Sequence, residues 1–155
     1  MLKSFSWAFA GPPLQLAAVL LAVLLRALMV GAVAGIGLVL LQQPLIAAAF
    51  HIAPASDTVE SFARTYLGIR IWGAPATIML YALTGWLVAL ERTRLVLILL
   101  LFQNGLNVAL NLWFVLGLGW GVAGVASATL IAEWSGFALG LWLTRDAFGP
   151  VLRAA

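Results

Sequence analysis

The chain has 155 residues, of which 65% are hydrophobic and 8% are charged, and its mean hydropathy is +1.12. Soluble domains are nearer half apolar and about a quarter charged, so a soluble globular domain of this length is excluded. The net charge of +3 comes from lysines and arginines scattered singly rather than clustered on one face, which argues against a nucleic-acid partner. Because there is no cysteine, neither a disulfide framework nor a thiolate metal site is expected.

Residues 1–26 are predicted to be an N-terminal segment. The first ten residues end in an Ala-x-Ala pattern but lack the apolar run of a signal peptide, so no cleavable leader is predicted. Leu14–Leu25 is apolar and is followed by Arg26. We expect a short interfacial helix here, with the Arg26 side chain reaching the lipid headgroups. The alternative, a separate crossing, would need a hairpin for which no turn residues are present.

Four apolar segments follow, each close to the roughly 20 residues that a helix needs to cross a hydrocarbon core of about 30 Å. A polar stretch with a proline (His51–Asp57), a charged turn (Glu91–Arg94) and a glycine-rich turn (Gly117–Gly121) separate them. The predicted fold is therefore all-α, a polytopic transmembrane helix bundle. The predicted spans are about 27–48, 66–90, 95–116 and 122–143, within one unit of residues 27–144, and a cytoplasmic tail follows at 145–155.

Lysines and arginines set the predicted orientation, because cytoplasmic ends of membrane helices carry an excess of them. The opposite side has a mixed, mildly acidic set of charges, so both termini are predicted to be cytoplasmic in a multi-pass protein of the cell inner (plasma) membrane. With four crossings, one side receives Lys3, Arg26, Arg92, Arg94, Arg145 and Arg153, and the other receives His51, Asp57, Glu60 and Arg64.

Polar residues inside three of the spans are the best functional signal, because such residues are costly at bilayer depth and usually face a bundle interior or a watery cavity. At about 100° per residue, each set shares one face of its helix. Pro75 is expected to kink the second span. The sets are Tyr66, Arg70, Gly73, Thr77, Tyr81 and Thr84 in the second span, Asn104, Asn107 and Asn111 in the third, and Thr129, Glu133, Gly136 and Gly140 in the fourth.

Each signal also has a purely structural interpretation. The asparagines could simply join helices by hydrogen bonds of about 0.6 kcal/mol each, and the tyrosines could be interfacial anchors. Glu133 is the one carboxylate deep within the spans, and it must be protonated, paired with a cation such as an arginine, or exposed to a water-filled path. A charge at mid-depth costs about 2.5–3.5 kcal/mol even on the lenient scale, which favours a functional role for Glu133.

An enzyme is not predicted. An intramembrane hydrolase would need a serine with a nearby histidine, two membrane aspartates or a metal-binding cluster. His51 lies in a loop and is assigned no role, no aspartate lies inside a span, and Ser135 lacks a base.

The order and spacing of several motifs resemble one family of transporters. From about Arg26 to Arg145 the chain resembles the multidrug and toxic compound extrusion (MATE) transporters, in particular their DinF-like branch. The resemblance implies twelve helices in two six-helix lobes, of which the four spans correspond to the third to sixth helices of the first lobe. It also implies export of cationic or amphipathic compounds in exchange for H⁺ or Na⁺, with no other cofactor. The motifs are Ile69-Arg70-Ile71-Trp72-Gly73-Ala74-Pro75-Ala76, Tyr81-Ala82-Leu83-Thr84-Gly85-Trp86, Asn104-Gly105-Leu106-Asn107-Val108-Ala109-Leu110-Asn111, Gly119-Trp120-Gly121-Val122-Ala123-Gly124-Val125-Ala126 and Ala128-Thr129.

The resemblance also implies binding residues. In the family, a cation site of the first lobe uses an acidic residue on the first helix, an Asn and an Asp one turn apart on the fifth, and a Thr on the sixth. These correspond here to Asn107, Asn111 and Thr129, and Asn111 stands where the motif usually has Asp. Glu133, Tyr66 and Tyr81 complete the predicted substrate- or cation-binding set, the tyrosines by stacking on organic cations.

The sequence therefore predicts a fragment of a MATE-type exporter that does not transport alone, because alternating access requires two opposed units. The predicted partners are the lipid bilayer, small organic or cationic solutes, and a second lobe or further copies of the chain. Two alternatives are a non-transporting membrane remnant of a truncated gene and a half-lobe that needs a partner subunit.

Overall fold

The computed structural model describes residues 13–52 and 56–152, and within them the side chains of residues 19–52 and 56–145. The prediction that the chain has no cleavable leader concerns its first residues, which lie outside the described range. In the described part there is no strand, and the all-α prediction is confirmed. The elements are α1 (Pro13–Leu40), α2 (Gln42–Ile52), α3 (Asp57–Arg70), the 3₁₀ turn η1 (Ile71–Gly73), α4 (Ala74–Ala89), α5 (Thr93–Asn111), the π-helical segment η2 (Leu112–Gly117) and α6 (Gly121–Leu152).

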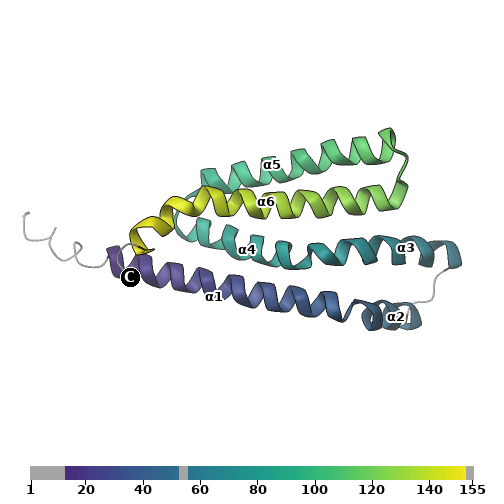
Figure 1. Ribbon diagram of the computed structural model, residues 1–155, viewed down its shortest axis with the longest axis horizontal. Helices are drawn as coiled ribbons and strands as arrows, with labels where there is room; N and C mark the ends of the chain where they lie inside the picture. The colour runs from purple at the N-terminus through teal and green to yellow at the C-terminus, as the bar shows by residue number, and fades with distance from the viewer. Residues whose placement is uncertain (1–12, 53–55, 153–155) are drawn as a thin grey trace, which may run out of the picture.

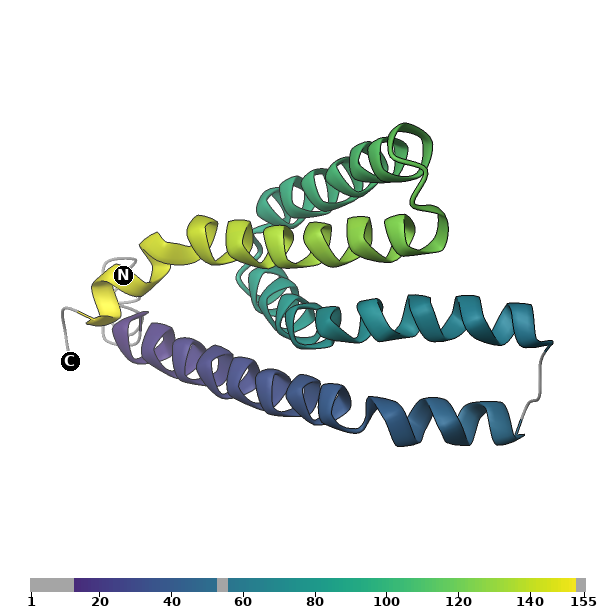
Figure 2. The same ribbon diagram turned by 45° about the vertical axis from the view of Figure 1, so that its right-hand side comes forward.

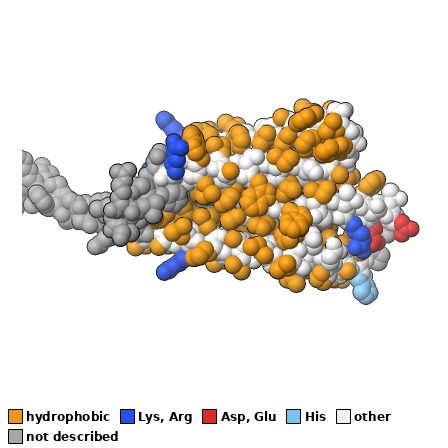
Figure 3. All heavy atoms as spheres, in the orientation of Figure 1, with side chains coloured by type: hydrophobic (Ala, Val, Ile, Leu, Met, Phe, Trp, Pro, Cys, Tyr) orange, Lys and Arg blue, Asp and Glu red, His pale blue; other side chains and the backbone are white. Residues whose placement is uncertain are grey.

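Four helical stretches are long and apolar enough to cross a membrane, namely Val19–Leu40, Asp57–Ala89, Thr93–Gly117 and Gly121–Arg145. Many large apolar side chains on them remain exposed, and hydrophobic atoms cover the middle of the face seen in Figure 3. Such a continuous apolar surface is unfavourable in water but fits the hydrocarbon of a bilayer. The chain is a multi-pass membrane protein.

The helices lie side by side in the order α1, α4, α6 and α5 (Figures 1 and 2). α6 occupies the interior of this row, since it contacts α3, α4 and α5. The apolar core combines Leu24 of α1 with Leu83, Trp86 and Leu87 of α4 and Leu99 of α5. This core holds together the end of the bundle at which α1 begins.

Most charged side chains lie toward the two ends of the bundle. α1 begins and α6 ends at the same end (Figure 1), and Lys and Arg side chains gather there on the face seen in Figure 3. Acidic and histidine side chains, with some Lys or Arg, lie at the opposite end (Figure 3). The even number of crossings is consistent with the predicted topology. Which end faces the cytoplasm stays a prediction.

The first crossing begins and ends earlier than predicted. Leu14–Leu25 is helical, as expected, but α1 continues without a break past Arg26 to Leu40. The helix is interrupted at Leu41, inside the predicted span 27–48, and α2 follows. Pro44 explains the interruption, because it has no N–H to donate to the carbonyl of Leu40 and its ring crowds that carbonyl. The interfacial position of Leu14–Leu25 stays a prediction.

Pro75 interrupts the second crossing, as predicted. α3 and α4 meet at η1 and bend relative to each other there (Figure 2). The proline ring and its missing N–H disfavour a regular turn just before it, so the backbone tightens into a 3₁₀ turn. The crossing starts at Asp57, before the predicted residue 66, and its first turns are supported by a Glu60–Arg64 ion pair of 2.6 Å at i, i+4.

The two predicted tight turns are confirmed. Glu91, between α4 and α5, has a φ of 58°. Gly119, between η2 and α6, has a φ of 69°, and Gly121, the first residue of α6, has a φ of 55°. Glycine adopts this left-handed conformation without the steric cost of a Cβ. α6 begins near the predicted residue 122 but extends to Leu152, so the predicted tail at 145–155 starts as a continuation of the helix.

Gly35→Ala is expected to destabilise the bundle. Gly35 of α1 packs directly on Pro75, and a Cβ there would overlap the proline Cα and backbone nitrogen. Neither backbone can yield cheaply, so a loss of about 1–3 kcal/mol is expected, measured as a lower unfolding temperature in detergent. Gly37→Ala is the matched control, because nothing lies within 4 Å of its added Cβ. Equal unfolding temperatures for the two variants would contradict this packing of α1 on α4.

Candidate functional site

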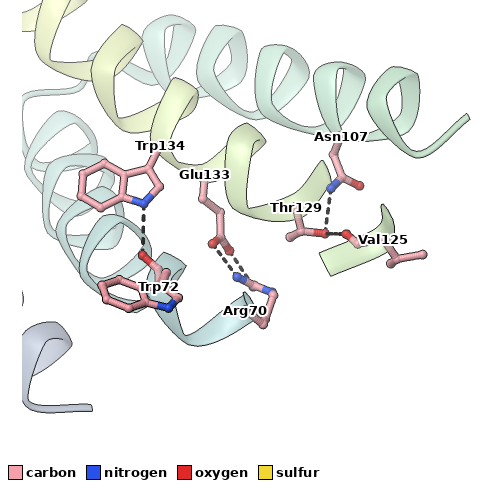
Figure 4. A network of polar contacts seen from close by, with 7 residues as sticks. All are labelled: Arg70, Trp72, Asn107, Val125, Thr129, Glu133 and Trp134. Atoms are coloured by element: carbon pink, nitrogen blue, oxygen red, sulfur yellow. Dashed lines mark hydrogen bonds and ion pairs between the residues drawn. The ribbon is translucent and has the colours of Figure 1, made fainter. Parts of the chain in front are cut away.

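Arg70 and Glu133 form an ion pair between α3 and α6. Glu133 is only 4% exposed. Arg70, the last residue of α3, donates from Nη1 to Glu133 Oε2 at 2.5 Å and from Nη2 to Oε1 at 2.6 Å (Figure 4). This bidentate arrangement is the strong form of a charge-assisted hydrogen bond. Of the three states that the sequence leaves open for Glu133, the structure shows pairing with an arginine.

The ion pair depends on the turn η1. A Cβ at Gly73 would overlap Glu133 Oε2 and would lie 2.8 Å from Arg70 Nη1, so a larger residue here would force the ends of these two side chains to shift. A second bond fastens the same turn, since Trp134 Nε1 donates to the backbone carbonyl of Trp72 at 3.1 Å (Figure 4). Two consecutive residues of α6 therefore fix the bend in the second crossing.

The predicted amide and hydroxyl residues meet between α5 and α6. Asn107 Nδ2 donates to Thr129 Oγ1 at 3.0 Å, and the Thr129 hydroxyl donates to the Val125 carbonyl at 3.0 Å (Figure 4). Asn111 Nδ2 donates to the Asn107 carbonyl at 2.9 Å and to Asn107 Oδ1 at 3.0 Å. Asn111 Oδ1 is buried and accepts no hydrogen bond from the described residues. This cluster, Asn107, Asn111 and Thr129, thus contains a free acceptor.

The two polar contacts are neighbours on α6 but bind different helices. Thr129 and Glu133 are four residues apart, one turn of α6; Thr129 contacts α5 and Glu133 contacts α3 (Figure 4). Among the described residues, no hydrogen bond joins Glu133 to Asn107. The structure therefore brings together Asn107, Asn111 and Thr129, and it places Glu133 next to them with a partner of its own. Their roles in binding stay predictions.

The two tyrosines lie in different surroundings. Tyr66, one turn before Arg70 on α3, interacts with the guanidinium. Tyr81 of α4 is 74% exposed and lines a cleft of ≈ 230 Å³ between α4, α5 and α6. Of the described residues that line this cleft, only Glu133 is charged. The others are Thr77, Leu80, Thr84, Leu99, Leu100, Gln103 and Asn104.

Arg70 is the main residue that lies outside the predicted binding set. A sequence signal for it exists, because Arg70 is the one cation and Glu133 the one carboxylate within the four predicted spans. Opposite charges at bilayer depth usually pair with each other. The Trp134 bond to a backbone carbonyl has no comparable signal. Among the described residues, no group of three or more His, Asp or Glu could hold a metal ion.

The fold and these contacts define a multi-pass helical membrane protein whose crossings are joined by buried polar groups. Residues 14–113 match the MatE family model. The chain is also 41% identical over 133 residues to the DNA damage-inducible protein F of Escherichia coli (strain K12). It therefore belongs to the MatE family, and the resemblance seen in the motifs is confirmed. The family match begins upstream of Arg26.

The chain spans 28% of the length of this curated relative, while the match covers 86% of the chain itself. No solved structure gives a significant match.

Gly73→Ala is expected to destabilise the chain, because the added methyl group overlaps the ends of Glu133 and Arg70 and disturbs their bidentate geometry. Separating a largely buried pair fully would cost about 3–5 kcal/mol; because Arg70 is partly exposed and can shift, we expect about 1–3 kcal/mol. The measurement is thermal unfolding in detergent. Gly68→Ala on α3 is the control, since its Cβ would meet nothing within 4 Å. A Gly73→Ala chain as stable as this control would mean that the pair does not depend on the turn.

Proposed function

We propose that this chain is part of a MATE-type secondary exporter, which moves small organic or cationic solutes across the cell inner membrane in exchange for H⁺ or Na⁺. Membership of the MatE family supports the transporter class. The observation that carries the proposal is the cluster of Asn107, Asn111 and Thr129, which joins α5 to α6 in the crossings. Polar groups at this depth typically mark a solute or ion pathway.

In this proposal the cluster supplies oxygen ligands to the coupling ion or the solute. Asn111 Oδ1 is buried without a donor among the described residues, so it keeps its full acceptor capacity. Thr129 Oγ1 retains a second lone pair, and Glu133, one turn away, contributes the negative charge. Tyr66 and Tyr81 offer aromatic faces to an organic cation.

The proposed exporter contains more helices than the four crossings described. Alternating access works by rocking two opposed units about a central site. We therefore propose that this unit acts with a complementary lobe or with further copies of the chain, and that its arginine-rich end faces the cytoplasm. Reconstituted alone in vesicles, the chain is expected to give no protonophore-sensitive dye efflux. Robust efflux by the chain alone would contradict the need for a second unit.

Thr129→Val is expected to reduce transport by the assembled exporter about tenfold, because it removes the hydroxyl that accepts from Asn107 while keeping the side-chain volume. The measurement is ethidium efflux from proteoliposomes under a pH or sodium gradient. Thr144→Val is the matched control on the same helix, since the Thr144 hydroxyl donates to the α6 carbonyls of Gly140 and Leu141 and bonds no other described residue. Equal efflux by both variants would remove the cluster from the proposed pathway.

A further inference from the structure

A mostly apolar groove runs along the bundle, with α1 and α2 on one side and α3 and α4 on the other. Two depressions form it, one of ≈ 260 Å³ and one of ≈ 160 Å³, and they are continuous because Leu67 and Ile71 line both. Leucines at its rim are exposed, so the groove opens on the bilayer-facing surface. The other lining residues are Leu38, Arg70, Ala74, Thr77 and Ile78 in the first depression and Gln42, Leu45, Ile46 and Ala49 in the second.

The dimensions of the groove suit one alkyl chain of a lipid. From Leu67 to Ile78 the second crossing rises about 16 Å, close to half of the roughly 30 Å hydrocarbon core. A helix about 10–12 Å wide would need more than about 1,000 Å³ over that length, so a further helix does not fit inside. Arg70 lines the groove, but Glu133 neutralises its charge and the pair stays intact beside an alkyl chain.

A polar site lies on the same face of α3, beyond the apolar part of the groove. Glu60 and Arg64 share this face with Leu67, because residues three and four apart are neighbours on a helix. The Arg64 guanidinium also lies over the Phe50 ring of α2, 5.1 Å from its centroid, so it stands at the mouth between α2 and α3. Arg64 is about 4.5 Å along the helix from Leu67, at the depth where headgroups follow the hydrocarbon.

The Glu60–Arg64 ion pair leaves bonding capacity of both signs. Arg64 Nε and Nη2 both donate to Glu60 Oε1, at 2.8 Å and 2.6 Å. The guanidinium has five N–H donors, so it retains donors for a phosphate. Glu60 Oε2 accepts no hydrogen bond from the described residues, so it can accept from an ammonium group. A polar depression of ≈ 440 Å³ beside the pair, lined also by Asp57, Ser61 and Thr65, has room for such a headgroup.

We propose that this groove binds one phospholipid whose headgroup carries a phosphate and a primary ammonium, as in phosphatidylethanolamine. An acyl chain lies along Leu67 and Ile71, the phosphate accepts from Arg64, and the ammonium donates to Glu60. Both the ion pair and the headgroup are neutral overall, so binding adds no net charge. The lipid also fills the space beside α2, of which Ile46 is the one buried residue, and holds this helix against α3.

The first test compares headgroups on the full chain. Native mass spectrometry from detergent measures the affinities for phosphatidylethanolamine and phosphatidylcholine with identical acyl chains. Phosphatidylethanolamine is expected to bind about fivefold more tightly, since the quaternary ammonium of phosphatidylcholine has no N–H to donate to Glu60. Glu60→Gln should bind the two lipids equally. Glu91→Gln, which changes an exposed glutamate near the other end of the bundle, should keep the preference.

Arg64→Gln is expected to weaken the binding of both lipids about fivefold, because both headgroups carry the phosphate. Arg94→Gln is the matched control, since Arg94 is an exposed arginine at the start of α5 and lines no part of the groove. It should leave both affinities at the wild-type value.

Ala74→Leu tests the acyl-chain part of the groove. The larger side chain fills the first depression, so both lipids should bind about tenfold more weakly while the headgroup preference remains. Ala47→Leu is the matched control, because Ala47 is exposed on α2 and does not line the groove. Ala49→Leu, which fills the second depression, decides the question if Ala74→Leu does not fold, as judged by helical circular dichroism.

Three results would overturn the lipid site: equal wild-type affinities for the two lipids, an unchanged preference in well-folded Glu60→Gln, or lipid binding by the groove-filling variants equal to that of Ala47→Leu. A dimer of the chain that binds no lipid would also overturn it, because a second copy would then cover the groove. None of these measurements depends on efflux, so the lipid site and the proposed function can fail separately.

Discussion

The need to neutralise one buried carboxylate organises this bundle. An isolated charge at the centre of a bilayer is so costly that it acquires a partner, a proton or water. Here the partner is Arg70, and its bidentate contact with Glu133 determines how the second and fourth crossings meet. A Cβ at position 73 would overlap the ends of both side chains, so the glycine leaves this geometry undisturbed. One electrostatic requirement thus accounts for the partner of Glu133 and for the contact of α3 with α6.

The bend in the second crossing serves the same contact. Pro75 disfavours a regular helix before it, and the resulting turn brings the Trp72 carbonyl to the Trp134 indole (Figure 4). On its other side, Pro75 packs on Gly35 of α1 without an intervening side chain. A change in the bend would therefore alter contacts with both α1 and α6.

The crossings could be predicted because hydrocarbon thickness imposes a length and a composition on each span. Their ends were less predictable: Pro44 interrupts the first crossing at Leu41, and Arg26 does not end a helix, since a snorkelling arginine is compatible with a continuous one. The helical phase correctly grouped Asn107 with Asn111. The contact between Asn107 and Thr129 depends on how α5 and α6 are rotated about their axes, which a pattern on either helix alone does not contain.

The position of α6 explains why two polar contacts with different partners lie one turn apart. Thr129 connects this helix to α5, and Glu133, one turn later, connects it to α3, so the polar face of α6 is divided between two neighbours. A movement of α6 away from α3 or from α5 would therefore also strain its contact with the other helix. Loss of the Arg70–Glu133 pair alone would leave the Asn107–Thr129 bond to α5 and the Trp134–Trp72 bond to η1 in place, so α6 would stay attached on both sides.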